Sequence, residues 1–423
     1  MRRPLLASLL GAVLLSPGNA YATPAVTQLM ASPAFKAAVA VLDRDHDRIV
    51  ADIITLTEIP APPFKEQARA KAYMAMLEAA GLTDVEMDAE GNVMGLRRGT
   101  GPAGGAVVAI AAHLDTVFPE GTSVKVRREG TRLFAPGIGD DTRSLAVLLG
   151  YVRAMNAAKV TTKSDILFVG NVGEEGPGDL RGMRYMFSKG RYKDRIKTFL
   201  SMDGTDAARV VNGGVGSKRY RVTFKGPGGH SYGAFGIVNP MVAMSKAVVD
   251  LYKLPVPQDP KTTYSASVTG GGTSVNSIPH DVFMEFDMRS VSPAELKKLE
   301  VRFLATIAAA AAAENAARST GSGKVSAELK IIGERPAGGT PETSALVQGA
   351  LAAARAHGLA PTLAASSTDS NIPMSLGIPA ITIGSGGRGG RAHSLDEWID
   401  VEKASSLKGM TVSLTTLLAV AAN

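Results

Sequence analysis

The stretch AVVAIAAHL (residues 106–114) decides the fold class, because it is an unbroken apolar run that ends in a histidine. A strand with one wet face alternates polar and apolar residues, whereas a strand buried on both faces is apolar throughout. Similar runs are SDILFVGN (164–171), IKTFLSMD (196–203) and PAITIG (379–384). Helical patterns accompany them at 141–157, 342–357 and 403–422. The sequence therefore predicts an α/β fold, in which helices cover a mostly parallel sheet.

The pattern changes near residue 214, where polar and apolar residues begin to alternate. SKRYRVTFKG (217–226) and HDVFMEFDMRS (280–290) alternate in this way, which is typical of strands with one face in water. Two helices are expected beside them, at about 240–253 and 293–316. This segment is therefore predicted to be a smaller α+β domain inserted into the main one.

The first 22 residues, MRRPLLASLLGAVLLSPGNAYA, have the three parts of a secretory signal peptide. Basic residues precede a short apolar stretch, and the segment ends in Ala20-Tyr21-Ala22. No later segment has the ~20 uninterrupted apolar residues of a membrane helix. We therefore expect a soluble protein that is exported to the periplasm or secreted, with no membrane span in the mature chain. The expected division is 1–22 signal peptide, 23–213 first part of the main domain, 214–330 inserted domain, and 331–423 second part of the main domain.

Composition excludes several kinds of site. The chain has no cysteine, so any metal must be held by histidine and carboxylate, and a cysteine nucleophile is excluded. The formal net charge is +7, but the basic residues are scattered, so no nucleic-acid partner is expected. The glycine-rich stretches VTGGGTS (268–274) and GSGGRGGR (384–391) lack the Lys-Ser/Thr ending of a phosphate loop, which argues against nucleotide binding.

Acidic residues and histidines follow the predicted buried strands directly. They are His113 and Asp115, Asp140 and Asp141, Glu174 and Glu175, Asp203, and His393. Because open α/β sheets bind ligands at the carboxyl ends of their strands, we expect these side chains to converge. Two imidazoles and several carboxylates suit a pair of divalent cations, zinc by preference.

The adjacent glutamates Glu174 and Glu175 lie in the stretch ILFVGNVGEEGPG (166–178), which has no basic residue beside them. Consecutive residues in a non-helical turn point in different directions. One glutamate can therefore bind a metal while the other accepts a proton from a water molecule on that metal. A single pair of this kind is usually a surface feature, but its recurrence at several strand ends favours a two-metal site.

The motifs HLD (113–115), GDD (139–141), GEEG (173–176), MDG (202–204) and AHS (392–394) occur in an order that resembles the di-zinc exopeptidase family. That family includes peptidase T, glutamate carboxypeptidase, acetylornithine deacetylase and the aminoacylases. GPGGHSYG (226–233) and GGTSVNSIP (271–279) are similar to parts of its smaller lid or dimerisation domain. One departure is Thr142-Arg143, where the family often has Lys-Gly. This position is not a ligand, so the departure concerns the fit of the substrate.

The resemblance implies two Zn²⁺ ions per subunit, with Co²⁺ or Mn²⁺ as alternatives. The implied ligands are His113 and Asp203 on one ion, Glu175 and His393 on the other, and Asp140 as the bridge. Asp115 would orient His113, and Glu174 would be the general base.

The resemblance also implies substrate-binding residues in the inserted domain. His230 would polarise the scissile carbonyl, often from the partner subunit of a homodimer. Asn276 and Arg289 would grip the substrate, and the alternation of FMEFDMR (283–289) puts Arg289 on the wet face of its strand. Of the other histidines, we expect His46 and His357 at the surface and His280 in a structural turn.

These observations predict an exported di-zinc exopeptidase that acts on short peptides. An alternative with the same fold is a deacylase or deacetylase of N-acyl amino acids. A third hypothesis, an inactive peptide-binding protein, is disfavoured by the intact set of ligands and base. The sequence leaves open the substrate, the choice between aminopeptidase and carboxypeptidase, the native metal and the oligomeric state.

Overall fold

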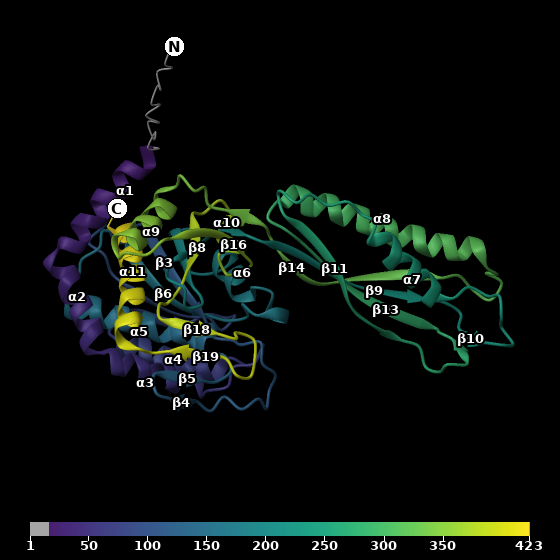
Figure 1. The fold of residues 1–423 in the computed structure, drawn as a ribbon, viewed down its shortest axis with the longest axis horizontal. Coiled ribbons are helices and arrows are strands. Elements are labelled where there is room, and N and C mark those ends of the chain that lie inside the picture. Colours follow the sequence, from purple (N-terminus) through teal and green to yellow (C-terminus); the bar gives the residue numbers. More distant parts are fainter. Residues whose placement is uncertain (1–16, 423) are drawn as a thin grey trace, which may run out of the picture.

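A computed structural model of the chain describes residues 17–422 and contains two lobes (Figure 1). The larger lobe is built on a nine-stranded sheet of order β1-β2-β6-β3-β7-β17-β8-β15, in which β16 also pairs with β8. Its strands are β1 (Thr83–Met87), β2 (Val93–Arg97), β3 (Val107–His113), β6 (Asp165–Asn171), β7 (Ile196–Met202), β8 (Arg209–Gly214), β15 (Gly338–Gly339), β16 (Thr362–Ser366) and β17 (Ala380–Ile383).

The four apolar runs of the sequence form the centre of this sheet. Strands β6, β3, β7 and β17 pair in parallel, which confirms the predicted fold class. Antiparallel pairs flank them, β2 with β6 and β8 with β17. Because the central strands run in the same direction, their carboxyl ends open at one edge of the sheet.

Strand β3 explains why the runs are apolar throughout. Val108, Ile110 and Ala112 belong to the core on one face of the sheet. Their neighbours in the strand, Val107, Ala109 and Ala111, belong to the core on the other face. Helices cover both faces, so a polar side chain at any of these positions would be buried without a partner.

Most helices of the larger lobe pack on the first of these faces, while α6 and α10 contribute to the second. The helices are α1 (Pro17–Ala31), α2 (Pro33–Arg44), α3 (His46–Thr57), α4 (Gln67–Ala79), α5 (Arg143–Ala157), α6 (Arg181–Ser188), α9 (Ala345–Ala356), α10 (Asn371–Ser375) and α11 (Lys403–Ala421). Side-chain caps fix several starts; for example, Ser344 accepts a hydrogen bond from the N–H of Val347 at the start of α9. A small four-stranded sheet completes the lobe with β4 (Arg127–Glu129), β5 (Arg132–Phe134), β18 (Arg388–Gly390) and β19 (Trp398–Asp400).

Helix α11 is apolar and long enough to cross a membrane by length and composition alone. The helices α1 and α2, bent by 67°, pass the same test only as a pair. In α11, 67% of the apolar window is buried inside the fold, and the helix packs against α9. This burial is typical of a core helix.

The smaller lobe contains a four-stranded antiparallel sheet of order β11-β13-β9-β14. Its elements are β9 (Gly216–Lys225), β11 (Thr262–Gly271), β13 (Asp281–Ser290), β14 (Ser326–Arg335), α7 (Pro240–Leu251) and α8 (Pro293–Ala317). Residues of β13 alternate between buried and more exposed, as the sequence pattern predicts. The buried face packs under the two helices around Phe224, Phe286 and Phe303. A short pair, β10 (Gly229–His230) and β12 (Ser277–Ile278), lies at the end of the lobe far from the larger one (Figure 1).

The chain crosses between the lobes twice, and the two crossings lie side by side. Strand β9 begins at Gly216 and β14 ends at Arg335, and Arg335 pairs in register with Ser217. The smaller lobe is therefore a continuous insertion whose two ends meet at the larger lobe.

Candidate active site

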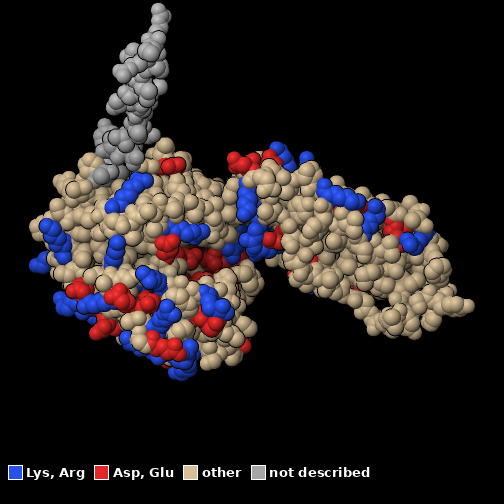
Figure 2. Space-filling model, viewed as in Figure 1, with Lys and Arg blue, Asp and Glu red and all other residues tan. Residues whose placement is uncertain are grey.

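Loops at the carboxyl edge of the central strands bring together most of the predicted site residues. His113 ends β3, Glu174 and Glu175 follow β6, and Asp203 follows β7. Asp140 lies in the turn Ile138–Thr142 before α5. A cavity of about 530 Å³ is lined by Asp140, Glu174, Glu175, Asp203, Arg289 and His393, among others. In Figure 2, acidic and basic side chains meet in the hollow between the lobes.

Asp140 lies between two histidines. Its Oδ1 is 2.9 Å from His113 Nε2, and its Oδ2 is 3.1 Å from His393 Nε2. Glu175 Oε1 is also 2.9 Å from His393 Nε2. One possible ligand atom from each of His113, Asp140 and Glu175 lies within 4.8 Å of the other two. Asp140 would therefore be placed to hold a metal ion together with either histidine.

The electrostatics of these groups fit a cation. Burial, together with the charge of Asp140, raises the pKa of Asp203 to about 7. Hydrogen bonds to Asp140 and Glu175 raise the pKa of His393 to about 10. Burial opposes the charge on His113, but contacts with Asp115 and Asp140 raise its pKa as well. The crowded carboxylates therefore make this a site that favours a cation, and the donor set of imidazole and carboxylate is one that zinc accepts.

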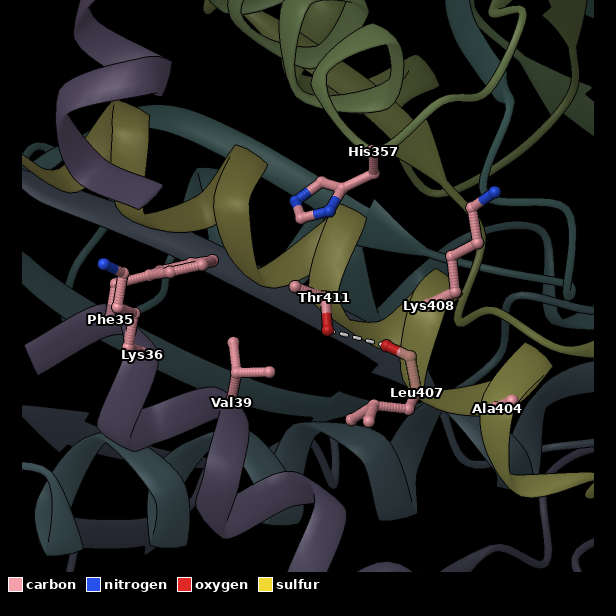
Figure 3. Close-up of a pocket in the computed structure, with 8 residues that line it drawn as sticks. All are labelled: Phe35, Lys36, Val39, His357, Ala404, Leu407, Lys408 and Thr411. Carbon is pink, nitrogen blue, oxygen red and sulfur yellow. Dashed lines mark hydrogen bonds between the residues drawn. The ribbon is translucent and has the colours of Figure 1, made fainter. Parts of the chain in front are cut away.

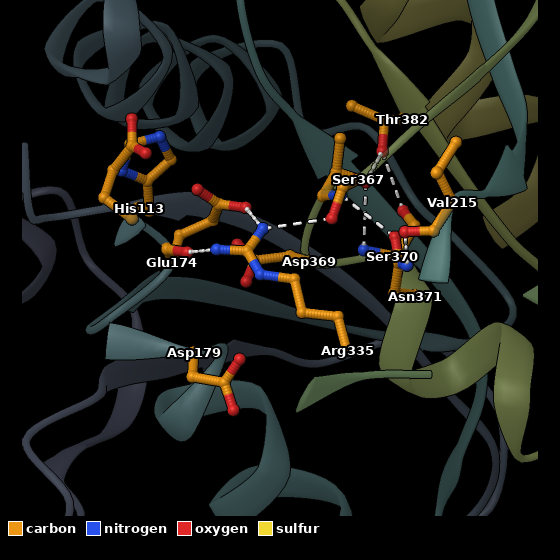
Figure 4. Close-up of polar contacts among 12 residues, drawn as sticks. His113, Glu174, Asp179, Val215, Arg335, Ser367, Asp369, Ser370, Asn371 and Thr382 are labelled. Atoms are coloured by element: carbon orange, nitrogen blue, oxygen red, sulfur yellow. Dashed lines mark hydrogen bonds and ion pairs between the residues drawn. The ribbon is translucent and has the colours of Figure 1, made fainter. Parts of the chain in front are cut away.

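Glu174 is 5% exposed. It contacts Arg335, a residue that was not predicted from the sequence to belong to the site (Figure 4). Arg335 Nη1 lies 3.1 Å from Glu174 Oε1, and Nη2 donates to the backbone carbonyl of Glu174. Arg335 Nη1 also donates to Ser367 Oγ at 3.2 Å. Burial raises the pKa of Glu174, and the charge of Arg335 opposes this shift. The sequence gives one hint of this contact, because Arg335 is a charged residue at the end of the last strand of the inserted domain.

Asp115 contacts His113 through its backbone more closely than through its carboxylate. The backbone oxygen is 3.0 Å from His113 Nδ1, whereas Asp115 Oδ1 is 3.7 Å away. The carboxylate instead accepts hydrogen bonds from the N–H groups of Glu174, at 3.1 Å, and Glu175, at 2.8 Å. The structure therefore adds a role to the predicted one, because Asp115 also fixes the turn that carries both glutamates.

Glu397 is a second buried carboxylate that holds a loop of the site, and it was not predicted from the sequence. It is 1% exposed. Its oxygens accept hydrogen bonds from the N–H groups of Gly137 at 2.9 Å, Gly139 at 2.7 Å and Asp140 at 2.9 Å. Glu397 thus ties the loop of His393 to the loop of Asp140. In the sequence it looks like an ordinary surface residue beside Asp396.

The three predicted substrate-binding residues lie in different places. Arg289 lines the cavity with Asp140 and Glu174. His230 is exposed on β10, where its Nδ1 accepts hydrogen bonds from the N–H groups of Tyr232 and Gly233. Asn276 lies beside it, because its carbonyl accepts a hydrogen bond from Ser231 N. The structure therefore brings His230 and Asn276 together, but at the far end of the smaller lobe (Figure 1).

Two of the other histidines are less exposed than expected. His46 is buried, with 6% exposure, because α3 packs it into the larger lobe. His357 is half-buried and lies 3.0 Å from Thr415 Oγ1. It lines a separate cavity of about 490 Å³ between α2 and α11 (Figure 3). The expectation of two plain surface residues is therefore wrong for His46 and only partly right for His357, whereas His280 is exposed in a turn.

Comparisons with known proteins give consistent results. Residues 109–419 match the sequence model of Peptidase family M20/M25/M40. Succinyl-diaminopimelate desuccinylase of Burkholderia multivorans is 26% identical over 230 residues, which are 50% of this chain and 60% of that protein. The chain thus matches less than two thirds of the length of this curated relative.

Solved structures share the two-lobed fold. Aminopeptidase PepT of Bacillus cereus has a TM-score of 0.71 at 21% identity, covering 88% of this chain and 99% of that one. A tripeptidase of Staphylococcus aureus has a TM-score of 0.71 at 19% identity, covering 89% and 99%. The Bacillus subtilis YXEP protein, described as a dinuclear metal binding peptidase, has a TM-score of 0.65 at 17% identity, covering 89% and 99%.

The prediction of a periplasmic or secreted protein is contradicted by these comparisons. The solved structures that share the fold are those of an aminopeptidase and a tripeptidase. Residues 1–16 of the predicted signal peptide lie outside the described residues. From Pro17, α1 continues across the predicted cleavage point after Ala22 and ends only at Ala31. The prediction of export is therefore wrong.

Proposed function

Because this chain belongs to peptidase family M20/M25/M40, we propose that it is a metal-dependent exopeptidase that hydrolyses short peptides. The observation that carries this proposal is Asp140, whose two carboxylate oxygens face His113 and His393 at 2.9 and 3.1 Å. The proposed ligands are His113 and Asp203 on one ion, Glu175 and His393 on the other, and Asp140 between them. Two zinc ions, when bound there, supply Lewis acidity and a water of lowered pKa.

The chain's own residues complete the reaction. Glu174 is the proposed general base, since it lines the cavity beside Glu175 without belonging to the ligand set. Arg335 contacts the Glu174 carboxylate, and Asp115 keeps the turn of both glutamates in place. Arg289 is proposed to bind the carboxylate at the end of the substrate, because a guanidinium suits this group.

His230 and Asn276 are proposed to act in the site of a partner subunit. They lie together at the end of the smaller lobe, remote from the proposed metal ligands of their own chain (Figure 1). Mixing His230→Ala with Glu174→Gln protein should then restore some activity in hybrid dimers, since one site of the hybrid has both residues intact. No restoration despite demonstrated subunit exchange would contradict the shared site.

A deacylase of N-acyl amino acids is the second candidate, because the curated relative is a desuccinylase. The discriminating experiment supplies zinc, cobalt or manganese to purified protein and compares dipeptides and tripeptides with N-acetyl and N-succinyl amino acids. Peptide cleavage that is lost on chelation and restored by metal is expected. Cleavage of the acyl amino acids alone would favour the second candidate, and full activity without metal would refute both.

A further inference from the structure

The cavity lined by the proposed metal ligands is also rich in arginine. Arg219 of β9, Arg289 of β13 and Arg335 at the end of β14 all line the cavity, and Arg209 of β8 joins them from the larger lobe. Among the ion pairs of the described residues, Arg335 is taken by Glu174, and none involves Arg209. A single carboxylate, Asp287, pairs with both Arg219 and Arg289.

The pairing with Asp287 leaves much of both guanidinium groups available. Asp287 Oδ1 is 3.0 Å from Arg219 Nε, and Asp287 Oδ2 is 2.7 Å from Arg289 Nε. Each arginine therefore uses its inner nitrogen, and the terminal nitrogens remain for a ligand. Two positive charges against one negative charge leave one positive charge on this part of the wall, which favours an anion.

The backbone around Arg219 leaves space for its side chain. Gly333 of β14 is its partner in register. A Cβ atom at residue 333 would lie 3.2 Å from Arg219 Cδ and 3.4 Å from its Nη1, which is tighter than ordinary contact. The nearby Asp179 is engaged by Arg184 and by the N–H of Glu334. Among the ion pairs of the described residues, Asp179 is paired with Arg184 and not with Arg219.

We propose that Arg219 and Arg289 together form a two-carboxylate subsite, so that the preferred substrate has a second carboxylate near the one that Arg289 binds. This inference rests on the proposed function for the role of Arg289. The second carboxylate belongs either to an acidic residue at the end of a peptide or to a dicarboxylic acyl group. Both sources present the same chemistry to the arginines.

Matched substrates separate the two sources. Ala-Glu against Ala-Gln tests an acidic terminal residue, and N-succinyl-alanine against N-butanoyl-alanine tests a dicarboxylic acyl group. We expect kcat/KM to be about tenfold higher, or more, for the acidic member of at least one pair. The reason is that the acidic member makes a charge-assisted contact with Arg219 that the neutral member lacks. Arg219→Gln should remove most of that preference.

Arg221→Gln is the matched control. Arg221 lies on the same strand and the same face, but Glu285 already pairs with it at 2.6 Å, and it does not line the cavity. This variant should retain the acidic preference. Equal cleavage of both members of both pairs by the wild type would overturn the inference, and so would loss of the preference in both variants to the same extent.

Binding without turnover makes the result independent of the proposed reaction. In chelator-treated protein, calorimetry should show glutarate binding about tenfold more tightly than butyrate, and Arg219→Gln should abolish the difference. If this discrimination holds while no amide is cleaved, the proposed function fails and the subsite stands. If amides are cleaved but neither glutarate nor acidic substrates are preferred, the subsite is wrong and the proposed function stands.

Discussion

Asp115→Asn should destabilise the protein, whereas Asp141→Asn should not. Both aspartates are fully buried, but their environments favour opposite charge states. Burial alone would raise the pKa of Asp115, yet contacts with His113 and with the N–H groups of Glu175 and Glu174 lower it. Burial raises the pKa of Asp141 well above its usual value, and its Oδ1 has no hydrogen-bond partner. An uncharged amide is therefore a poor substitute at 115, where the charged carboxylate is favoured, and a good one at 141, where the neutral carboxyl is favoured.

The magnitude follows from the two hydrogen bonds that Asp115 accepts at 3.1 and 2.8 Å. Asparagine retains one acceptor oxygen and turns its amide group toward the remaining N–H. One charge-assisted bond is lost, at about 1.5–3 kcal/mol, and a buried donor is left without a partner, at roughly 1–3 kcal/mol. Partial relaxation lowers the sum, so we expect the free energy of unfolding to fall by about 2–4 kcal/mol.

Chemical denaturation of chelator-treated protein at pH 7 measures this effect without interference from metal. The sign of the pH dependence gives a second check. Because the folded pKa of Asp115 is depressed, its contribution is complete above the unfolded pKa of ~3.9 and is lost as the pH falls through the folded value. The deficit of Asp115→Asn should therefore shrink in acid. The reasoning is refuted if the two asparagine variants lose equal stability, or if Asp115→Asn remains within about 0.5 kcal/mol of the wild type.

The remaining predictions concern three other parts of the molecule. Glu174→Gln should lose on the order of 10²–10⁴ in turnover while it retains metal, as expected for a general base. Glu175→Ala should instead bind less metal. If elemental analysis showed the reverse, Glu175 would be the base and Glu174 the ligand. Glu397→Ala should weaken metal retention in a chelator titration, because three N–H donors of the Asp140 loop lose their acceptor, and the exposed neighbour in Asp396→Ala should have no such effect. In the smaller lobe, burial raises the pKa of Glu300, but hydrogen bonds from Lys297, Tyr220 and Lys218 bring it down to about 2. The wild type should therefore lose up to about 3 kcal/mol of stability between pH 4.5 and 2. Denaturation curves of Glu300→Gln at those two pH values should not show this loss.

The central sheet could be predicted from the sequence because its signal is local. In β3, seven consecutive buried residues face two cores in alternation, so the apolar run itself records the environment. The smaller lobe was predictable for the same reason, since one wet face gives strict alternation in β13. The motifs at the strand ends also pointed to one edge, because parallel strands bring their carboxyl ends together.

The residues that support the site could not be predicted in this way. Glu397 meets the loop of Asp140 across a separation of 258 residues, and Arg335 meets Glu174 across 161. No local pattern records such contacts, because a buried glutamate and a surface glutamate look alike in a sequence. The contact of Asp115 with the turn of Glu174 and Glu175 could not be predicted for the same reason. The prediction of export failed for a different reason, since it rested on the composition of one terminal segment and on no contact within the fold.

The two crossings between the lobes have a consequence for how such a chain can change over evolutionary time. Since Ser217 and Arg335 face each other in register, a single contiguous stretch of coding sequence could be removed or exchanged, and a very short linker would rejoin the larger lobe. The inserted lobe is thus modular, but two of its residues contribute to the site in the larger lobe. Its final residue, Arg335, holds Glu174, and Arg289 lines the cavity. A change of lobe would therefore alter substrate choice and the environment of the proposed base together, while the proposed metal ligands, all of them in the larger lobe, would remain.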